Sequence, residues 1–315
     1  MTSVLEITVS VICCVLICGL STIGNTVVIF VFIRRKDILT ISNYFFASLS
    51  FGNLIVGLFY PLQCLVDLGV VSSKTLCLPF LYSLLVLAYV VIWSLLALTV
   101  ERYLTITCPL TASRVLSEKR AVVVIILIYS FGVICGVVIP VLLSISAPSD
   151  ENSNSCRFID LVPSSFYRIF LLGNRLVSVA VFIGIYGSIF VVMRKHMRAI
   201  AVQIRPTPQL PTSTEQTNED SISTIGVRHE TGRWKRQVRP TILLFVVVLY
   251  HCLSSIPQLF AFNNVERSSL VLTVTHFVMY SSSAINPLLY GISNRQFRRA
   301  FSSVFFPIND IGNRS

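Results

Sequence analysis

Charged residues are scarce in this chain of 315 residues, because Asp, Glu, Lys and Arg together make up only 12% of it. A soluble domain carries about twice that fraction, so the shortage argues against a water-soluble protein. The mean hydropathy of +0.78 points the same way. Negative charge is the scarcer kind, with 14 acids against 25 Lys and Arg.

Three further patterns are absent, and each absence argues against a class of protein or segment. The sequence has no alternating short apolar segments, which are typical of an outer-membrane barrel, and no internal repeat, which many transporters have. The first apolar run is too long for a removable signal peptide and ends in Arg34-Arg35-Lys36 instead of a small-residue cleavage site. We therefore expect this run to act as a signal anchor.

Apolar residues make up 54% of the chain and occur in long continuous blocks. A helix needs about 20 of them to cross a bilayer, and backbone groups inside lipid must be hydrogen-bonded within the segment, which favours helices. Seven blocks are long enough: residues 7–33, 42–68, 76–107, 121–144, 166–193, 241–262 and 269–292. The sequence therefore predicts an all-α membrane protein with a seven-transmembrane helix bundle.

Charge predicts the orientation of this bundle. If the N-terminus is extracellular, the cytoplasmic segments hold 20 Lys and Arg against 8 acids, and the outer segments hold 5 against 6. This bias is the positive-inside pattern, so the basic composition needs no nucleic acid to explain it, although it also suits an anionic inner leaflet. We expect a multi-pass protein of the plasma membrane with a cytoplasmic C-terminus.

The chain divides into one membrane domain, residues 1–292, and a short amphipathic helix with a cytoplasmic tail, residues 293–315. Residues 195–237 are expected to form a long, partly disordered third cytoplasmic loop, because they are polar and interrupted by proline. In the amphipathic helix, predicted over residues 294–306, aromatic residues recur four apart with arginines between them: Phe297, Phe301, Phe305, Arg295, Arg298 and Arg299. Such a helix suits the surface of the inner leaflet.

The run Glu101-Arg102-Tyr103 closes the third apolar block at the predicted inner edge of the membrane. Cys77 lies 25 residues earlier, about 37 Å along a helix, and so falls at the outer edge. Neighbouring side chains of opposite charge can neutralise each other and hold one end of a helix in a single state. We interpret the pair as a switch and not as a catalytic site.

The seventh block contains Asn286-Pro287-Leu288-Leu289-Tyr290. The proline removes one backbone hydrogen bond and bends the helix, and Asn286 and Tyr290 can then satisfy the freed groups or bind water inside the bundle. On its own, the motif is better explained by an ordinary proline kink.

Arg175 lies within the fifth apolar block, beside Asn174. A charge at that depth is costly, which indicates an inward role such as binding an anionic or carbonyl group of a ligand. The alternative is that the side chain extends outward to the membrane surface or pairs with Asp67 or Glu266. The sequence leaves both open.

Two histidines lie in the last two blocks. His276 and Tyr280 are four residues apart and therefore share one face of the seventh helix, which suits either a pocket or hydrogen bonding between helices. His251 lies deeper, and we expect it to pack against its neighbours instead of sensing pH.

Several motifs follow one another along the chain: Gly24-Asn25, Glu101-Arg102-Tyr103 with Pro109-Leu110, the outer cysteines Cys77 and Cys156, and Asn286-Pro287-Leu288-Leu289-Tyr290 with Phe297-Arg298-Arg299-Ala300-Phe301. Together they resemble the rhodopsin-like (class A) G-protein-coupled receptors, over almost the whole chain. A set of motifs in the right structural context is far more specific than any one of them.

The resemblance implies roles for these residues. Arg102 would pair with Glu101 at rest and receive a G protein when active, Tyr290 would swing inward, and Cys77 and Cys156 would form an outer disulfide. The implied switch residues are Glu101, Arg102, Tyr103, Leu110, Asn286, Pro287 and Tyr290, with Leu110 contacting the G protein. The implied core polar site consists of Asn25, Asn53 and Ser283.

The implied function is to convert the binding of an extracellular small molecule or short peptide into G-protein activation in the cytoplasm. Arrestin, a receptor kinase and membrane lipids are further implied partners, and we expect no catalytic residue, cofactor, metal ion or nucleic acid. The short segment before the first block argues against a large protein hormone. Candidate pocket residues are Leu84, Ala88, Tyr89, Asn174, Arg175, Ser255, Gln258, His276 and Tyr280.

The chain departs from the family at several positions. Leu84 stands where amine receptors have Asp, and Tyr280 where opsins have the retinal-binding Lys, so an amine mode and a retinal Schiff base are both disfavoured. Other usual residues are replaced as well: Asp by Asn53, Trp by Tyr129, Pro by Ser178, Phe by His251, Trp by Ser255 and an acid by Gln237. We therefore keep as an alternative a degenerate or partner-dependent receptor with weak or constitutive coupling, and expect high basal signalling. A transporter, a channel and an intramembrane enzyme are disfavoured.

We predict weak or absent modulation by sodium, because the neutral amide of Asn53 cannot supply the charge that a cation needs. The measurement is agonist affinity with and without sodium. A sodium-dependent loss of affinity that disappears in Asn53→Ala would contradict the prediction.

Overall fold

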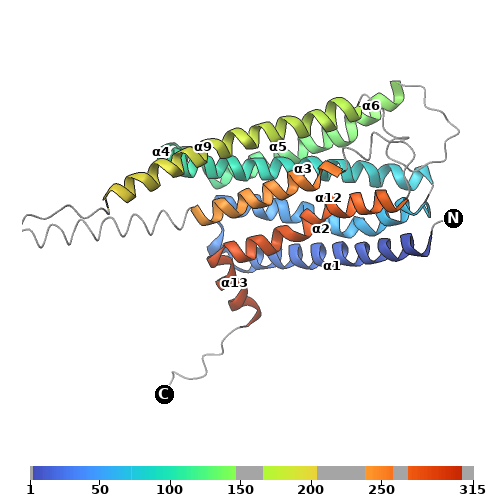
Figure 1. Ribbon diagram of the computed structural model, residues 1–315, viewed down its shortest axis with the longest axis horizontal. Coiled ribbons are helices and arrows are strands. Elements are labelled where there is room, and N and C mark those ends of the chain that lie inside the picture. Colours follow the sequence, from blue (N-terminus) through green and yellow to red (C-terminus); the bar gives the residue numbers. More distant parts are fainter. Residues whose placement is uncertain (1–2, 72, 147–165, 204–237, 258–268, 307–315) are drawn as a thin grey trace, which may run out of the picture.

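The structure is a computed structural model that describes residues 3–71, 73–146, 166–203, 238–257 and 269–306. These residues form a seven-helix bundle, as predicted, whose long helices run side by side (Figure 1). The long helices are α1 (Val4–Arg34), α2 (Ile41–Asp67), α3 (Lys74–Thr107), α5 (Glu118–Val133) continued through η2 (Ile134–Val138) and α6 (Ile139–Ser146), α9 (Gly173–Gln203) preceded by η3 (Tyr167–Leu172), Val238–Ser254, and α12 (Ser269–Ser293).

Three short helices complete the described part: η1 (Lys36–Ile38), α4 (Pro109–Val115) and α13 (Arg295–Phe305). The helix Val238–Ser254 is called the sixth helix below. Five of the described helices are long and apolar enough to cross a membrane, and the sixth helix is shorter but also apolar. The 25 residues of α12 are enough to span a bilayer as well.

The largest difference from the predicted spans is at the end of the fifth block. Helix α9 continues to Gln203, past the predicted end of this span at residue 193, while the start of the third cytoplasmic loop at residue 195 stays a prediction. Lys, Arg and His lower the hydropathy there, but Lys and Arg are good helix formers. The helix therefore extends beyond its apolar part. The rest of the predicted loop, residues 204–237, lies outside the described residues.

Helix α3 supplies the centre of the apolar core. Leu95 and Leu98 are completely buried among side chains of α2, α5, α9 and the sixth helix. The α5–η2–α6 segment approaches α3 so closely that a Cβ atom added to Gly136 would lie 2.5 Å from the backbone nitrogen of Val86. Only glycine fits at this contact.

The two ends of the bundle differ. Helices α4 and α13 lie at one end, called the α13 end, and the N-terminus and the end of α6 lie at the other, called the Cys77 end (Figure 1). Helix α13 confirms the predicted eighth helix: Phe297 and Ala300 are buried against Val31 and Phe32 of α1. The apolar face of α13 is therefore fixed to the bundle.

A polar contact also fixes α13. Arg35 forms an ion pair with Asp37, with 2.8 Å between Nε and Oδ1, and donates a hydrogen bond to Ser303 of α13. The guanidinium of Arg35 holds the pKa of Asp37 below its usual value, chiefly through the hydrogen bonds that it donates to the Asp37 carboxylate. Because both side chains are solvent-exposed, the pair orients the link between α1 and α2 more than it stabilises the fold.

Gly136→Ala is predicted to destabilise the bundle, because the new methyl group must push α3 away from the α5–η2–α6 segment. Overpacking of this kind costs about 1–3 kcal/mol. The control is Gly184→Ala in α9, where an added Cβ meets no atom within 4 Å. Thermal midpoints of the purified full chain should fall for the first variant only, and equal midpoints would contradict the close contact.

Candidate functional site

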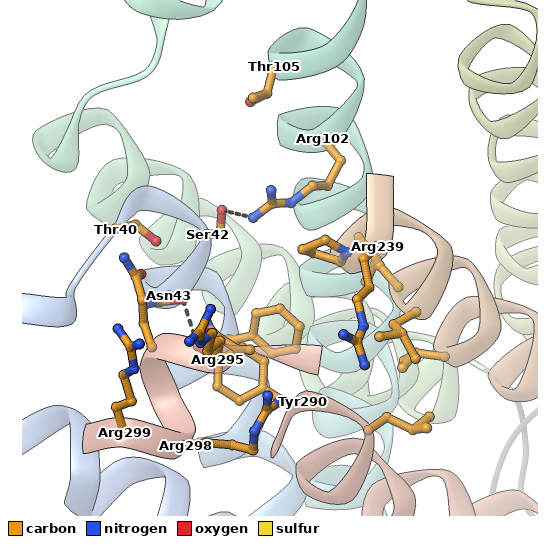
Figure 2. A pocket seen from close by; sticks show the side chains of 18 residues that line it. Thr40, Ser42, Asn43, Arg102, Thr105, Arg239, Tyr290, Arg295, Arg298 and Arg299 are labelled. Carbon is orange, nitrogen blue, oxygen red and sulfur yellow. Dashed lines mark hydrogen bonds between the residues drawn. The ribbon is translucent and has the colours of Figure 1, made fainter. Parts of the chain in front are cut away.

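A cavity of about 980 Å³ opens at the α13 end, between α2, α3, the sixth helix, α12 and α13. Five of its lining residues are arginines that come from α3, from α13 and from the start of the sixth helix, and they surround the space in Figure 2: Arg102, Arg239, Arg295, Arg298 and Arg299. None of the lining residues is acidic. The cavity is therefore shaped by apolar walls and carries a strongly positive potential.

Arg102 is held on two sides within this cavity. Its Nε lies 3.1 Å from Oε2 of Glu101, and its Nη2 donates a hydrogen bond to the hydroxyl of Ser42 in α2. Glu101 is buried and its other oxygen accepts a hydrogen bond from Thr105 at 3.2 Å. The pairing of neighbouring charges is present, but the partner on α2 was missed from the sequence.

Tyr290 is held by the next residue of α2. Its hydroxyl donates to Oδ1 of Asn43 at 2.7 Å and accepts from Nδ2 of Asn294 at 2.8 Å (Figure 2). The ring lies 4.2 Å from that of Phe46 and 4.9 Å from that of Phe297, between centroids. Consecutive residues at the start of α2 thus bind the switch residues of both α3 and α12.

The predicted core polar residues join α1, α2 and α12. Nδ2 of Asn25 donates to the carbonyl of Ser283 at 3.1 Å and to that of Ser21 at 2.8 Å. The Ser21 hydroxyl donates to the backbone carbonyl of Asn53 at 2.8 Å. Asn53 therefore takes part through its backbone, and both polar atoms of its side chain have no partner among the described residues.

A second polar cluster lies toward the Cys77 end, around Arg175. Its Nη1 donates to Nε2 of His251 at 3.0 Å and to the Ser255 hydroxyl at 2.8 Å. Nδ1 of His251 in turn lies 3.4 Å from the Ser282 hydroxyl of α12. Hydrogen bonds therefore run from α9 through the sixth helix to α12, and His251 packs as predicted while also bridging helices.

Asp67 forms a separate pair with His276. Its Oδ2 lies 2.8 Å from Nδ1 of His276, and its Oδ1 accepts from Gln63 at 2.9 Å. Both side chains of the ion pair are largely buried, with 5% and 13% exposure. Asp67 thus pairs with the seventh helix, and the alternative in which Asp67 neutralises Arg175 is wrong; Glu266 lies outside the described residues.

Sequence reasoning could not pair Asp67 with His276, because the two residues are far apart in the chain. The available signal was their common depth: Asp67 ends the second block, and His276 lies in the outer part of the seventh. His276 does lie beside Tyr280, with 6.2 Å between ring centroids, as their spacing predicted.

The remaining candidates are distributed as follows. Leu84 and Tyr89 are buried on α3, while Leu110 is 82% exposed on α4. Tyr103 packs beside Ile106 and Ile189, and Pro287 occupies the space that Gly24 leaves without a side chain. Ala88 of α3, Asn174 of α9 and Asn286 of α12 are partly or fully buried within the bundle.

Three predicted residues lie outside the described residues: Cys156, Gln237 and Gln258. Cys77 is disulfide-bonded, but its pairing with Cys156 stays a prediction. Within the described ranges, no group of three or more His, Cys, Asp or Glu could hold a metal ion. The clusters described above are suited to binding and to holding helices in place.

Comparison with known proteins identifies a family that matches most of the chain. The family described as 7 transmembrane receptor (rhodopsin family) matches residues 24–290. Adenosine receptor A2a of Cavia porcellus is 26% identical over 96% of this chain and 73% of its own length. Cholecystokinin receptor type A of Cavia porcellus is 25% identical over 91% of this chain and 78% of its own length. Alpha-1A adrenergic receptor of Oryzias latipes is 22% identical over 90% of this chain and 63% of its own length.

The Asp67–His276 pair generates a stability prediction. Asp67→Ala and His276→Ala should each lower the thermal midpoint of the purified chain, since removing one member of a buried pair costs about 3–5 kcal/mol. The double variant should lose less than the sum of the two. Asp37→Ala, which breaks the exposed pair with Arg35, is the control and should have little effect. Additive losses would show that the two side chains do not interact.

Proposed function

Since the chain belongs to the rhodopsin family of seven-transmembrane receptors, we propose that it converts the binding of an extracellular small molecule or short peptide into activation of a heterotrimeric G protein. The α13 end then faces the cytoplasm, in keeping with the positive-inside charge bias. The observation that carries the proposal is the cavity of about 980 Å³ with Arg102 in its wall.

The lining of this cavity suits an acidic or carboxylate-ended protein segment. Guanidinium groups form paired hydrogen bonds with carboxylates, and a positive surface attracts a negative partner during encounter. Apolar side chains such as Leu243, Val247 and Leu289 also line the space, so an amphipathic helix with acidic residues would be complementary in both respects. The G-protein segment that enters should be of this kind.

Two hydrogen bonds to α2 define the resting arrangement. Arg102 donates to Ser42 and Tyr290 donates to Asn43, so both side chains are bound to the cavity wall. An entering partner that binds Arg102 better than Ser42 does would shift the equilibrium toward the released state. A ligand at the opposite end acts on the same equilibrium if it prefers the same helix arrangement.

The names of the similar receptors refer to adenosine, cholecystokinin and an adrenergic ligand, so they do not agree on one ligand class. A plasma-membrane location and interactions with arrestin, a receptor kinase and lipids are part of the same proposal. The exposed rings of Phe305 and Phe306 at the end of α13 suit contact with the inner leaflet.

A second candidate is a receptor with constitutive coupling. Among the described residues, the acidic partner of Arg102 is its own neighbour Glu101, and no lining residue adds another acid. The restraint from outside α3 then comes from the neutral Ser42. We therefore expect basal signalling without added ligand.

The test is basal signalling in cells that express the full chain, measured with readouts for several G-protein classes. Wild type should exceed untransfected cells in at least one readout, and Arg102→Ala should return that signal to background at equal surface expression. Ser42→Ala should raise the signal, because a hydrogen bond to a charged group contributes about 1.5–3 kcal/mol, or tenfold or more in the two-state equilibrium.

The control for Ser42→Ala is Ser48→Ala in the same helix. The buried hydroxyl that it removes has no hydrogen-bond partner among the described residues. Its signal should equal that of wild type. Basal signalling that survives Arg102→Ala would contradict the assigned coupling site, and equal signals from the Ser42 and Ser48 variants would contradict the restraint by α2. If neither basal nor ligand-induced signalling occurs in any readout, the G-protein proposal fails.

A further inference from the structure

Arg175 is the third residue of α9 and lies within an apolar helix long enough to span the membrane. Its two hydrogen bonds with described residues, to His251 and Ser255, both use Nη1. The Nε and Nη2 groups, which form one edge of the guanidinium, donate to no atom of the described residues. Three N–H donors on that edge therefore have no protein acceptor there.

No carboxylate of the described residues neutralises this charge. Asp67 is paired with His276, and Glu101 with Arg102. The two hydrogen-bond acceptors of Arg175, the His251 ring and the Ser255 hydroxyl, are neutral. A charge inside the membrane without a counter-ion is costly, so the position indicates a ligand that brings negative charge.

Tyr89 supplies an independent observation on the facing helix α3. The residue is 2% exposed, and its hydroxyl has no hydrogen-bond partner among the described residues. An unsatisfied buried hydroxyl costs about 1–3 kcal/mol. Because α3 packs against α9, Tyr89 and Arg175 leave donors without acceptors on two adjoining helices.

We propose that the ligand of this receptor carries a carboxylate, which binds the Nε–Nη2 edge of Arg175 and accepts a hydrogen bond from Tyr89. The inference rests on the proposed receptor function and names the ligand class for its outer site. A carboxylate matches the guanidinium fork with two parallel hydrogen bonds. A neutral amide of the same shape presents one acceptor and no charge.

The same contacts explain how such a ligand reaches the rest of the bundle. Nη1 of Arg175 remains bound to His251 of the sixth helix and to Ser255, which directly follows that helix, and His251 lies beside Ser282 of α12. A carboxylate that fixes the guanidinium therefore fixes α9 against the sixth helix and α12. The ligand then favours one arrangement of these three helices over another.

The test uses the purified full chain in lipid nanodiscs and a panel of aliphatic and aromatic monocarboxylates, each paired with its primary amide. A ligand that binds the folded state raises the thermal midpoint with concentration. At least one carboxylate should raise the midpoint of wild type, while its amide should bind about a hundredfold more weakly. In Arg175→Gln, the response to that carboxylate should be lost.

Two tyrosine variants separate the site from general effects. Tyr89→Phe should weaken carboxylate binding, because it removes the proposed donor. Tyr60→Phe is the control, since Tyr60 is just as deeply buried, with 1% exposure, but packs in a different cluster, with Cys13, Cys64 and Ala284. Equal losses in both variants would contradict a role for Tyr89.

The midpoint without ligand gives a second readout that does not depend on finding the right carboxylate. Removing an uncompensated charge from the bundle should leave Arg175→Gln at least as stable as wild type. A midpoint several degrees lower would show that Arg175 stabilises the bundle without any ligand and would overturn the inference. So would a panel without any shift, or equal shifts with chloride and carboxylate.

These outcomes are distinct from failure of the proposed function. If signalling depends on Arg102 but no carboxylate binds, the receptor function stands and the ligand class is wrong. If a carboxylate binds through Arg175 but no readout shows signalling, the ligand class stands and the coupling to a G protein is wrong.

Discussion

The hydrogen bonds that Arg102 and Tyr290 donate to the start of α2 are the interactions on which the α13 end depends. Helix α2 can serve as a fixed wall because it packs against α1, α3, α5 and α12 and is tied to α1 through the hydroxyl of Ser21. The switch residues of α3 and α12 then share one anchor. Releasing one of them changes the surroundings of the other, since Ser42 and Asn43 are adjacent on the same helix.

The Arg175 cluster differs from this arrangement, because its hydrogen bonds involve no residue of α2. Arg175, His251 and Ser282 connect α9, the sixth helix and α12. The sixth helix also supplies Arg239 to the cavity at the other end. One helix therefore contributes to both polar sites. A change in its position moves residues at both sites, and no continuous chain of contacts along the bundle is needed.

The sequence was sufficient for features that depend on local composition. Apolar blocks predicted the spans, and the spacing of Phe297, Phe301 and Phe305 predicted α13, because burial and helix period are both local properties. The partners of Arg102 and Asp67 depend instead on how each helix is rotated about its axis. That rotation is set by packing against neighbouring helices, which explains why Ser42 and His276 were missed. The end of α9 was misplaced for another reason: helix formation continues past the point where hydropathy falls.

Arginine without a matching acid occurs at both ends of the described bundle, and the physical consequence is the same at each. A guanidinium group that is partly desolvated gains free energy when an anion replaces neutral acceptors or water. At the α13 end we propose an acidic protein segment for the five lining arginines, four of which are exposed, and toward the Cys77 end a small carboxylate for Arg175. If the two proposed binding events favour the same position of the sixth helix, each strengthens the other by the same factor. The scarcity of acids in the sequence therefore leaves arginine available to bind anions at both ends of the bundle.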